Sequence, residues 1–126
     1  MTSGSRHADR IECLDSVDPA VVQACAGQCR VLVSSRLHLL ILGANAGTPG
    51  VGIERGSKIT NWLSNFGETP AGTVESCDFS GVKSRIERFL AQPDYEVRAK
   101  VCLVTSAMRV RLAAAAEKLR RALEAK

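Results

Sequence analysis

The sequence predicts an α/β fold in which two or three parallel strands carry helices on both faces and a long helical segment follows them. Three observations lead to this prediction. A short β-branched run at residues 30–34 is followed by an apolar stretch of helical length and by a second strand-like run at residues 49–53. Residues 95–123 contain neither Gly nor Pro. The 126 residues suffice for one domain with its own core.

The first ordered element is expected just after a polar leader. Residues 1–17 show no apolar period, and we expect them to form a flexible leader. Asp18 and Pro19 then make a helix start, with Asp as the N-cap and Pro at the first helical position. Gly27 is expected to close this helix.

A strand-helix-strand unit follows. The strand at residues 30–34 leads into a helix whose N-cap is expected at Ser34 or Ser35 and which ends at Gly47. The second strand is expected at residues 49–53, after a turn marked by Pro. A crossover of this length makes the two strands parallel and brings the helix N-termini to the carboxyl edge of the sheet, where open α/β sheets bind ligands.

Three more helices and a possible third strand complete the prediction. A helix is expected from Ser57 to Gly67, and a short strand at residues 73–76. Asp78 can cap a further helix that ends before Pro93. Residues 95–123 are expected to form one long helix or two.

The net charge is modestly basic. The chain carries a formal charge of +4, which fits an anionic ligand but is common in proteins that bind none. Residues 109–126 alone account for this excess. We interpret them as a solvated helix face and expect no nucleic-acid partner, because interleaved aromatic residues and a docking motif are absent from the sequence.

The cysteines and the apolar runs indicate the compartment. Five cysteines without regular pairing predict free, buried thiols in a reducing compartment, and no metal site, because a second Cys/His pair at ligand spacing is missing from the sequence. The longest apolar run, residues 37–44, is far shorter than the roughly 20 residues needed to cross a bilayer. Together these features predict a cytoplasmic protein with no membrane span.

The candidate site lies at Ser34, Ser35, Arg36 and His38, where the first strand meets its helix. Helix N–H groups beside a guanidinium and an imidazole suit a phosphate or a carboxylate. His38 can donate to an anion or transfer a proton. Alternatively, His38 is a core histidine and Arg36 is exposed to solvent, and the local sequence alone slightly favours this structural role.

Two motifs and a lysine carry a family resemblance. They are Val31-Leu32-Val33-Ser34-Ser35-Arg36-Leu37-His38, then Gly47-Thr48-Pro49-Gly50-Val51-Gly52-Ile53, then Lys58. In this order they resemble the C-terminal half of polysaccharide pyruvyl transferases, in which an Arg-Leu-His stretch opens a helix, a Gly-x-Pro turn leads to the next strand and a lysine follows. The resemblance covers residues 18–126, which would form a partial C-terminal domain of that family, and it is sharp over residues 31–58.

The resemblance implies a fold and an activity. The fold would be that of the C-terminal half of a GT-B enzyme, in which two Rossmann-like domains face a cleft. Phosphoenolpyruvate would be the donor, the hydroxyl of a cell-surface polysaccharide sugar the acceptor and a pyruvate ketal the product, with no cofactor. By motif, His38 would be the catalytic acid, Arg36, Ser34 and Ser35 would bind the anion, and Lys58 would balance its charge.

The sequence also departs from the family. Residues 54–57 replace a tyrosine and an acidic residue that members usually have, which puts acceptor recognition in question. The N-terminal domain of the family is missing from this sequence, so we expect the chain to be inactive alone. Two other hypotheses remain open: a non-catalytic interaction or scaffold module, whose exposed sheet edge is covered by a protein partner or a second copy, and a fragment of another GT-B glycosyltransferase.

Overall fold

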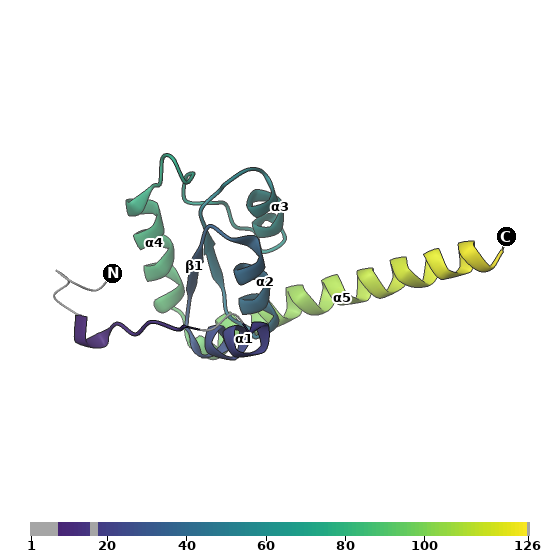
Figure 1. The fold of residues 1–126 in the computed structure, drawn as a ribbon, viewed down its shortest axis with the longest axis horizontal. Coiled ribbons are helices and arrows are strands. Elements are labelled where there is room, and N and C mark those ends of the chain that lie inside the picture. The colour runs from purple at the N-terminus through teal and green to yellow at the C-terminus, as the bar shows by residue number, and fades with distance from the viewer. Residues whose placement is uncertain (1–7, 16–17, 126) are drawn as a thin grey trace.

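The computed structural model describes residues 8–15 and 18–125, and it is mixed α/β and mostly helical (Figure 1). Of the predicted leader, residues 8–15 are described and begin with the 3-10 helix η1 (Ala8–Arg10), whereas residues 1–7 and 16–17 lie outside the described part. The later elements are α1 (Pro19–Gln28), β1 (Leu32–Ser34), α2 (Leu37–Asn45), β2 (Gly50–Gly52), α3 (Lys58–Ser64), α4 (Phe79–Leu90) and α5 (Asp94–Glu124).

The sheet of the described chain consists of β1 and β2, which are parallel as predicted. Ser34 pairs with Gly52, so the two strands end side by side. The prediction of a strand at residues 73–76 is wrong, since only Thr73 forms a single bridge, to Glu54. The N–H of Thr73 donates to the carbonyl oxygen of Ser76 at 3.1 Å, as part of a tight turn, and this turn ends the pairing after one residue.

Small residues on the sheet allow helices to pack closely against it. A Cβ at Gly50 would lie 2.7 Å from Leu40 Cδ2, and one at Gly52 would lie 2.6 Å from Ile59 Cγ2. Leu40, Ile59 and Leu63 therefore form a core between α2, α3 and one face of the sheet. Burial of each of these side chains contributes about 2 kcal/mol. Figure 1 shows α4 on the other side of the strands.

Two helix starts follow from local capping, as predicted. The carboxylate of Asp18 accepts a hydrogen bond from the N–H of Ala20 at 3.0 Å, and Pro19 is the first residue of α1. Asp78 accepts from the N–H of Gly81 at 2.9 Å at the start of α4. Both contacts span three residues or fewer, which explains why the sequence alone predicts them.

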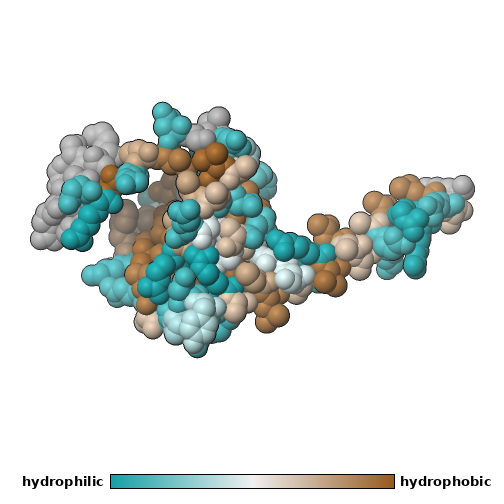
Figure 2. Space-filling model, turned by 90° about the horizontal axis from the view of Figure 1, so that it is seen from below, coloured by the Kyte–Doolittle hydropathy of each residue, from teal (hydrophilic) through white to brown (hydrophobic). Residues whose placement is uncertain are grey.

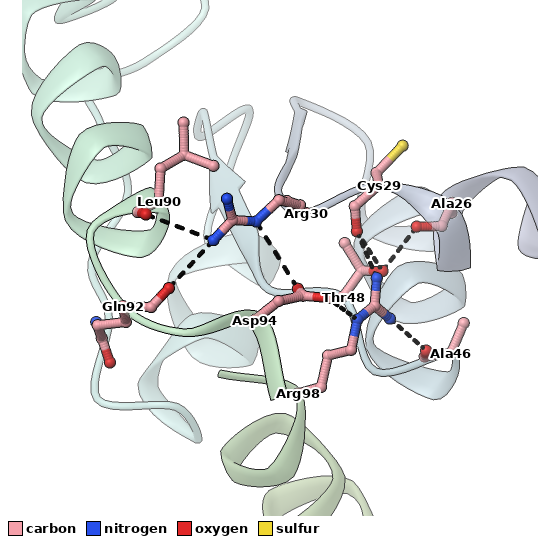
Figure 3. Close-up of polar contacts among 9 residues, drawn as sticks. All are labelled: Ala26, Cys29, Arg30, Ala46, Thr48, Leu90, Gln92, Asp94 and Arg98. Carbon is pink, nitrogen blue, oxygen red and sulfur yellow. Dashed lines mark hydrogen bonds and ion pairs between the residues drawn. The ribbon is translucent and has the colours of Figure 1, made fainter. Parts of the chain in front are cut away.

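Arg98 anchors the start of α5 to the body of the protein (Figure 3). Its guanidinium donates to the carbonyl oxygens of Cys29 at 2.9 Å and Ala46 at 3.3 Å, and its Nε lies 3.0 Å from a carboxylate oxygen of Asp94. Ala46 is the C-cap of α2, so Arg98 satisfies a carbonyl group that the helix itself leaves unpaired.

Arg30 makes similar contacts at the end of α4 (Figure 3). It donates to the carbonyl oxygens of Leu90 at 3.4 Å and Gln92 at 3.1 Å, and its Nε lies 4.0 Å from Asp94. In the same cluster, the hydroxyl of Thr48 donates to the carbonyl oxygen of Ala26 at 2.7 Å. Arg30 and Arg98 therefore have a structural role, because their guanidinium groups are already hydrogen-bonded to backbone carbonyl oxygens.

The second half of α5 projects from the body (Figure 1). Val97, Val101 and Thr105 are buried, but no residue of α5 after Thr105 is. Figure 2 shows apolar and hydrophilic side chains alternating along this projecting part. Among the helices that the structure describes, none is long and apolar enough to cross a membrane.

All five cysteines are free, as predicted, but their burial is not as predicted. Four are exposed and Cys77 is half-buried. Cys25 and Cys29 lie at the solvent-facing side of α1 and its end, and Cys102 lies on an exposed side of α5. Over residues 8–15 and 18–125, no group of three or more His, Cys, Asp or Glu side chains is arranged to hold a metal ion.

Candidate functional site

The predicted site residues lie at the carboxyl edge of the sheet. β1 ends at Ser34 and leads directly into α2, and β2 ends at Gly52 and leads through a loop into α3. Because the strands are parallel and end in register, the segment from Ser34 to His38 and the segment that leads to Lys58 start at the same edge. The sequence correctly predicts this common origin.

Ser34 has a structural role that the sequence does not reveal. Its side chain is buried, and its hydroxyl accepts a hydrogen bond from the N–H of Arg36 at 2.8 Å and donates to the carbonyl oxygen of Arg36 at 3.1 Å. This side-chain turn is a common use of serine where a chain changes direction. The Ser34 hydroxyl is thus committed to the backbone, and Ser35 beside it is half-buried.

The prediction that Ser34 or Ser35 caps α2 is wrong. The N-cap is Arg36, in an extended conformation with φ −109° and ψ 121°, and among the described residues no side chain makes a cap hydrogen bond to the helix. The physical reason is that the Ser34 turn delays the helix by two residues, so a side chain without an acceptor atom occupies the cap position. The N-terminus of α2 therefore keeps unpaired N–H donors.

Arg36, His38 and Lys58 are all exposed. In the part of the chain that the structure describes, their side chains make no hydrogen bond or ion pair, so the interpretation of His38 as a core histidine is not supported. Arg36 and His38 lie at the start of α2, where the helix dipole and the free N–H groups attract an anion. The cavity among α2, α3, α4 and α5 is lined by other residues.

Glu54 is the residue at this edge that the sequence analysis missed. It is only 7% exposed, and its carboxylate accepts hydrogen bonds from the N–H groups of Arg55 at 3.0 Å, Gly56 at 3.0 Å and Thr60 at 2.6 Å, and from the Thr60 hydroxyl. Thr60 lies in the first turn of α3, so Glu54 caps that helix from the preceding loop. Ser57, the predicted cap, occupies the N-cap position without a side-chain hydrogen bond.

The hydrogen bonds to Glu54 determine its charge. Burial raises the pKa of its carboxyl, but the Thr60 hydroxyl and the N–H groups of Gly56, Thr60 and Arg55 outweigh burial and lower the pKa from 4.5 to about 2. Glu54 is therefore ionised at neutral pH. Its carboxylate occupies the N-terminus of α3 and places a negative charge four residues before Lys58.

The two helix starts at this edge thus differ in what they can bind. The N-terminus of α3 already holds the carboxylate of Glu54, whereas the N-terminus of α2 has no side-chain cap and carries the exposed Arg36 and His38. An external anion at this edge finds free donors at α2 and a negative charge at α3. The structure therefore brings Arg36 and His38 together at the start of α2 and places Lys58 at the start of α3.

Comparisons of this chain with models of protein families, with curated proteins and with solved structures find no match.

Proposed function

We propose that the chain is part of a transferase that moves a pyruvyl group from phosphoenolpyruvate to a sugar hydroxyl of a polysaccharide, and that it binds the donor at the N-terminus of α2. One observation carries the proposal: α2 has no side-chain cap, and the exposed Arg36 and His38 lie at its N-cap and in its first turn. The order of the motifs in the sequence, which resembles that of polysaccharide pyruvyl transferases, adds independent support.

The chemistry of phosphoenolpyruvate fits these groups. The molecule carries a phosphate and a carboxylate, and the guanidinium of Arg36 can form two parallel hydrogen bonds to either group. Free N–H groups at the start of α2 supply further donors without needing a charged side chain. His38, two residues further along the chain, can donate a proton to the methylene carbon of phosphoenolpyruvate, which makes the phosphate-bearing carbon electrophilic. One sugar hydroxyl then adds to that carbon and loses its proton, and inorganic phosphate leaves as a second hydroxyl of the sugar takes its place and gives the ketal.

The proposed enzyme has a GT-B fold, with this chain as part of one Rossmann-like domain. The parallel β1-α2-β2 unit and the ligand-facing carboxyl edge support that fold. In such an enzyme a second domain supplies the other wall of the cleft and excludes water from the reaction. The donor is thus expected to bind weakly to this chain alone and to react only in the closed cleft.

Calorimetric titration with phosphoenolpyruvate tests the proposal. We expect saturable binding that Arg36→Ala and His38→Ala each weaken by about tenfold, because each removes a charged or strongly polar hydrogen-bond partner. Arg109→Ala, which removes an equal charge from the exposed part of α5, is the matched control and is expected to leave the affinity unchanged. Inorganic phosphate is expected to bind more weakly than phosphoenolpyruvate, because it lacks the carboxylate.

Two results would contradict this assignment. One is the absence of phosphoenolpyruvate binding both by the chain alone and by the chain supplied with a second domain. The other is an unchanged affinity and unchanged turnover for His38→Ala.

A second candidate function is a non-catalytic interaction module, favoured by the projecting part of α5. Leu112, Leu119 and Leu123 are between 62% and 71% exposed there. Glu117 and Glu124 are paired with arginines of the same helix, whereas Arg109 and Arg111 have no ion pair among the described residues. An acidic partner surface with apolar side chains would complement this helix. Light scattering distinguishes the two functions, since a chain that stays monomeric and binds no partner would count against the module.

A further inference from the structure

A cavity of about 230 Å³ lies away from the carboxyl-edge site, among α2, α3, α4 and α5. Its wall is mainly apolar and includes Leu40 from α2, Trp62 from α3, Phe66 from the turn after α3, Phe89 from α4 and Val101 from α5. The start of β2 also contributes, at Gly50, so both the sheet and the helices surround one hollow. The cavity is partly open to solvent, so a small molecule can reach it.

The size and lining of the cavity favour an apolar occupant. An apolar cavity of about 150 Å³ in another protein stays dry and binds benzene, and this one is larger. Two polar groups of the wall offer water few free hydrogen bonds, because the hydroxyl of Thr48 already donates to the carbonyl oxygen of Ala26 and the guanidinium of Arg88 is paired with Glu68. An apolar group that displaces such water therefore gains free energy.

Aromatic rings make up one part of the wall. The rings of Trp62 and Phe66 lie 5.4 Å apart between centroids and are tilted by 58°. Phe89 faces the same cavity from α4, and the guanidinium of Arg88 lies 5.0 Å from the centroid of its ring. A planar ring bound among these side chains can make edge-to-face and offset contacts with more than one of them.

The polar groups in the wall favour a negative charge on the ligand. Arg88 and Glu68 neutralise each other across an ion pair. Lys100 also lines the cavity, and within the described chain its ammonium group makes no hydrogen bond or ion pair. The wall therefore carries one net positive charge, on a residue that is exposed and can reach the opening.

We propose that this cavity binds a small aromatic carboxylate, with the ring among Trp62, Phe66 and Phe89 and the carboxylate directed towards Lys100. This binding is independent of the proposed donor site at α2, because the residues of that site do not line the cavity. The apolar wall supplies most of the affinity, and the lysine discriminates a carboxylate from a neutral ligand of the same shape.

The fluorescence of Trp62 provides a direct assay, because Trp62 is the only tryptophan of the chain. The probe is 3-phenylpropionate, which does not absorb at the wavelengths that excite tryptophan selectively, and 3-phenylpropanol is its neutral counterpart. We expect a saturable change in Trp62 emission with both probes and tighter binding of the carboxylate. Lys100→Gln is expected to lower the affinity for the carboxylate about threefold, as for the loss of an exposed charge pair, and to leave the affinity for the alcohol unchanged.

Two further variants complete the test. Lys118→Gln removes the same charge from the projecting part of α5 and is expected to leave both affinities unchanged. Val101→Phe fills the cavity and is expected to abolish binding of both probes; if circular dichroism shows that it does not fold, Val104→Phe, in the same wall, replaces it. The proposal is overturned if neither probe changes the emission in a saturable way, if Lys100→Gln leaves the preference for the carboxylate intact, or if a folded filled variant still binds.

Discussion

Glu54→Gln tests the buried carboxylate that caps α3. The folded state lowers the pKa of Glu54 from 4.5 to about 2, and this difference corresponds to about 3 kcal/mol of stability at neutral pH, at about 1.4 kcal/mol per pKa unit. The unfolded chain binds the proton first as the pH falls. The stabilisation is therefore fully present above about pH 4.5 and is lost as the pH falls towards about 2. By pH 3, about 2 kcal/mol of it should be gone.

Glutamine keeps the shape of the side chain but cannot be ionised. One carboxylate oxygen of Glu54 accepts from the N–H and hydroxyl of Thr60, and the other accepts from the N–H groups of Arg55 and Gly56. In glutamine an amide nitrogen replaces one of these oxygens, and because it cannot accept, one of the two pairs of hydrogen bonds is lost. We expect the free energy of unfolding of Glu54→Gln to be about 3 kcal/mol lower than that of the wild type at pH 7. The deficit should shrink to about 1 kcal/mol at pH 3, because the wild type then loses its own advantage.

Urea unfolding followed by circular dichroism at pH 7, 5, 4 and 3 measures this difference. Glu75→Gln is the matched control, because Glu75 is an exposed glutamate of the same region and the structure gives its side chain no role in a helix cap. Its unfolding curve should follow that of the wild type at each pH. If wild type and Glu54→Gln differ by the same free energy at every pH, the carboxylate does not cap α3 as described.

The remaining predictions concern the contacts of Arg98 at the start of α5 and two loop glycines, and the same urea assay measures them. Arg98→Met should lower the free energy of unfolding by about 2–3 kcal/mol, because it removes charged donors from the carbonyl oxygens of Cys29 and Ala46. Arg109→Met, on the projecting part of α5, should change it by no more than about 0.5 kcal/mol. Equal effects of the two substitutions would show that Arg98 does not anchor α5. Gly72→Ala should cost at least about 2 kcal/mol, because φ is +80° and the new Cβ would lie 2.5 Å from the carbonyl oxygen of Ser76. Gly56→Ala, where nothing lies within 4 Å, should be nearly neutral, and a large loss there would refute the steric argument.

The elements that the sequence predicts correctly depend on contacts between neighbours in the chain. Asp18 and Asp78 bond to N–H groups two and three residues ahead, so the cap can be recognised without knowledge of the fold. The strands around Val33 and Val51 are apolar runs of the right length between turn residues. Their parallel pairing follows from the helix that connects them.

Other features depend on geometry that the sequence does not encode locally. Arg98 binds carbonyl oxygens 52 and 69 residues earlier in the chain, and no local pattern indicates these partners. The composition predicts a third strand, but the positive φ of Gly72 and the turn that follows it leave only isolated bridges in this segment. Glu54 was within reach of sequence reasoning, since an acidic side chain shortly before a helix start is a possible cap.

The carboxyl edge shows why a motif alone is a poor guide to which groups bind a ligand. Serine at a helix start suggests a free hydroxyl, but Ser34 uses its hydroxyl to turn the chain, and this turn leaves α2 without a cap. Lys58 is the first residue of α3, a helix whose N-terminus already holds the carboxylate of Glu54. An anion drawn to this edge therefore meets a gradient of potential from Glu54 towards Arg36. The proposed donor site consequently depends on the start of α2 rather than on the full set of motif residues.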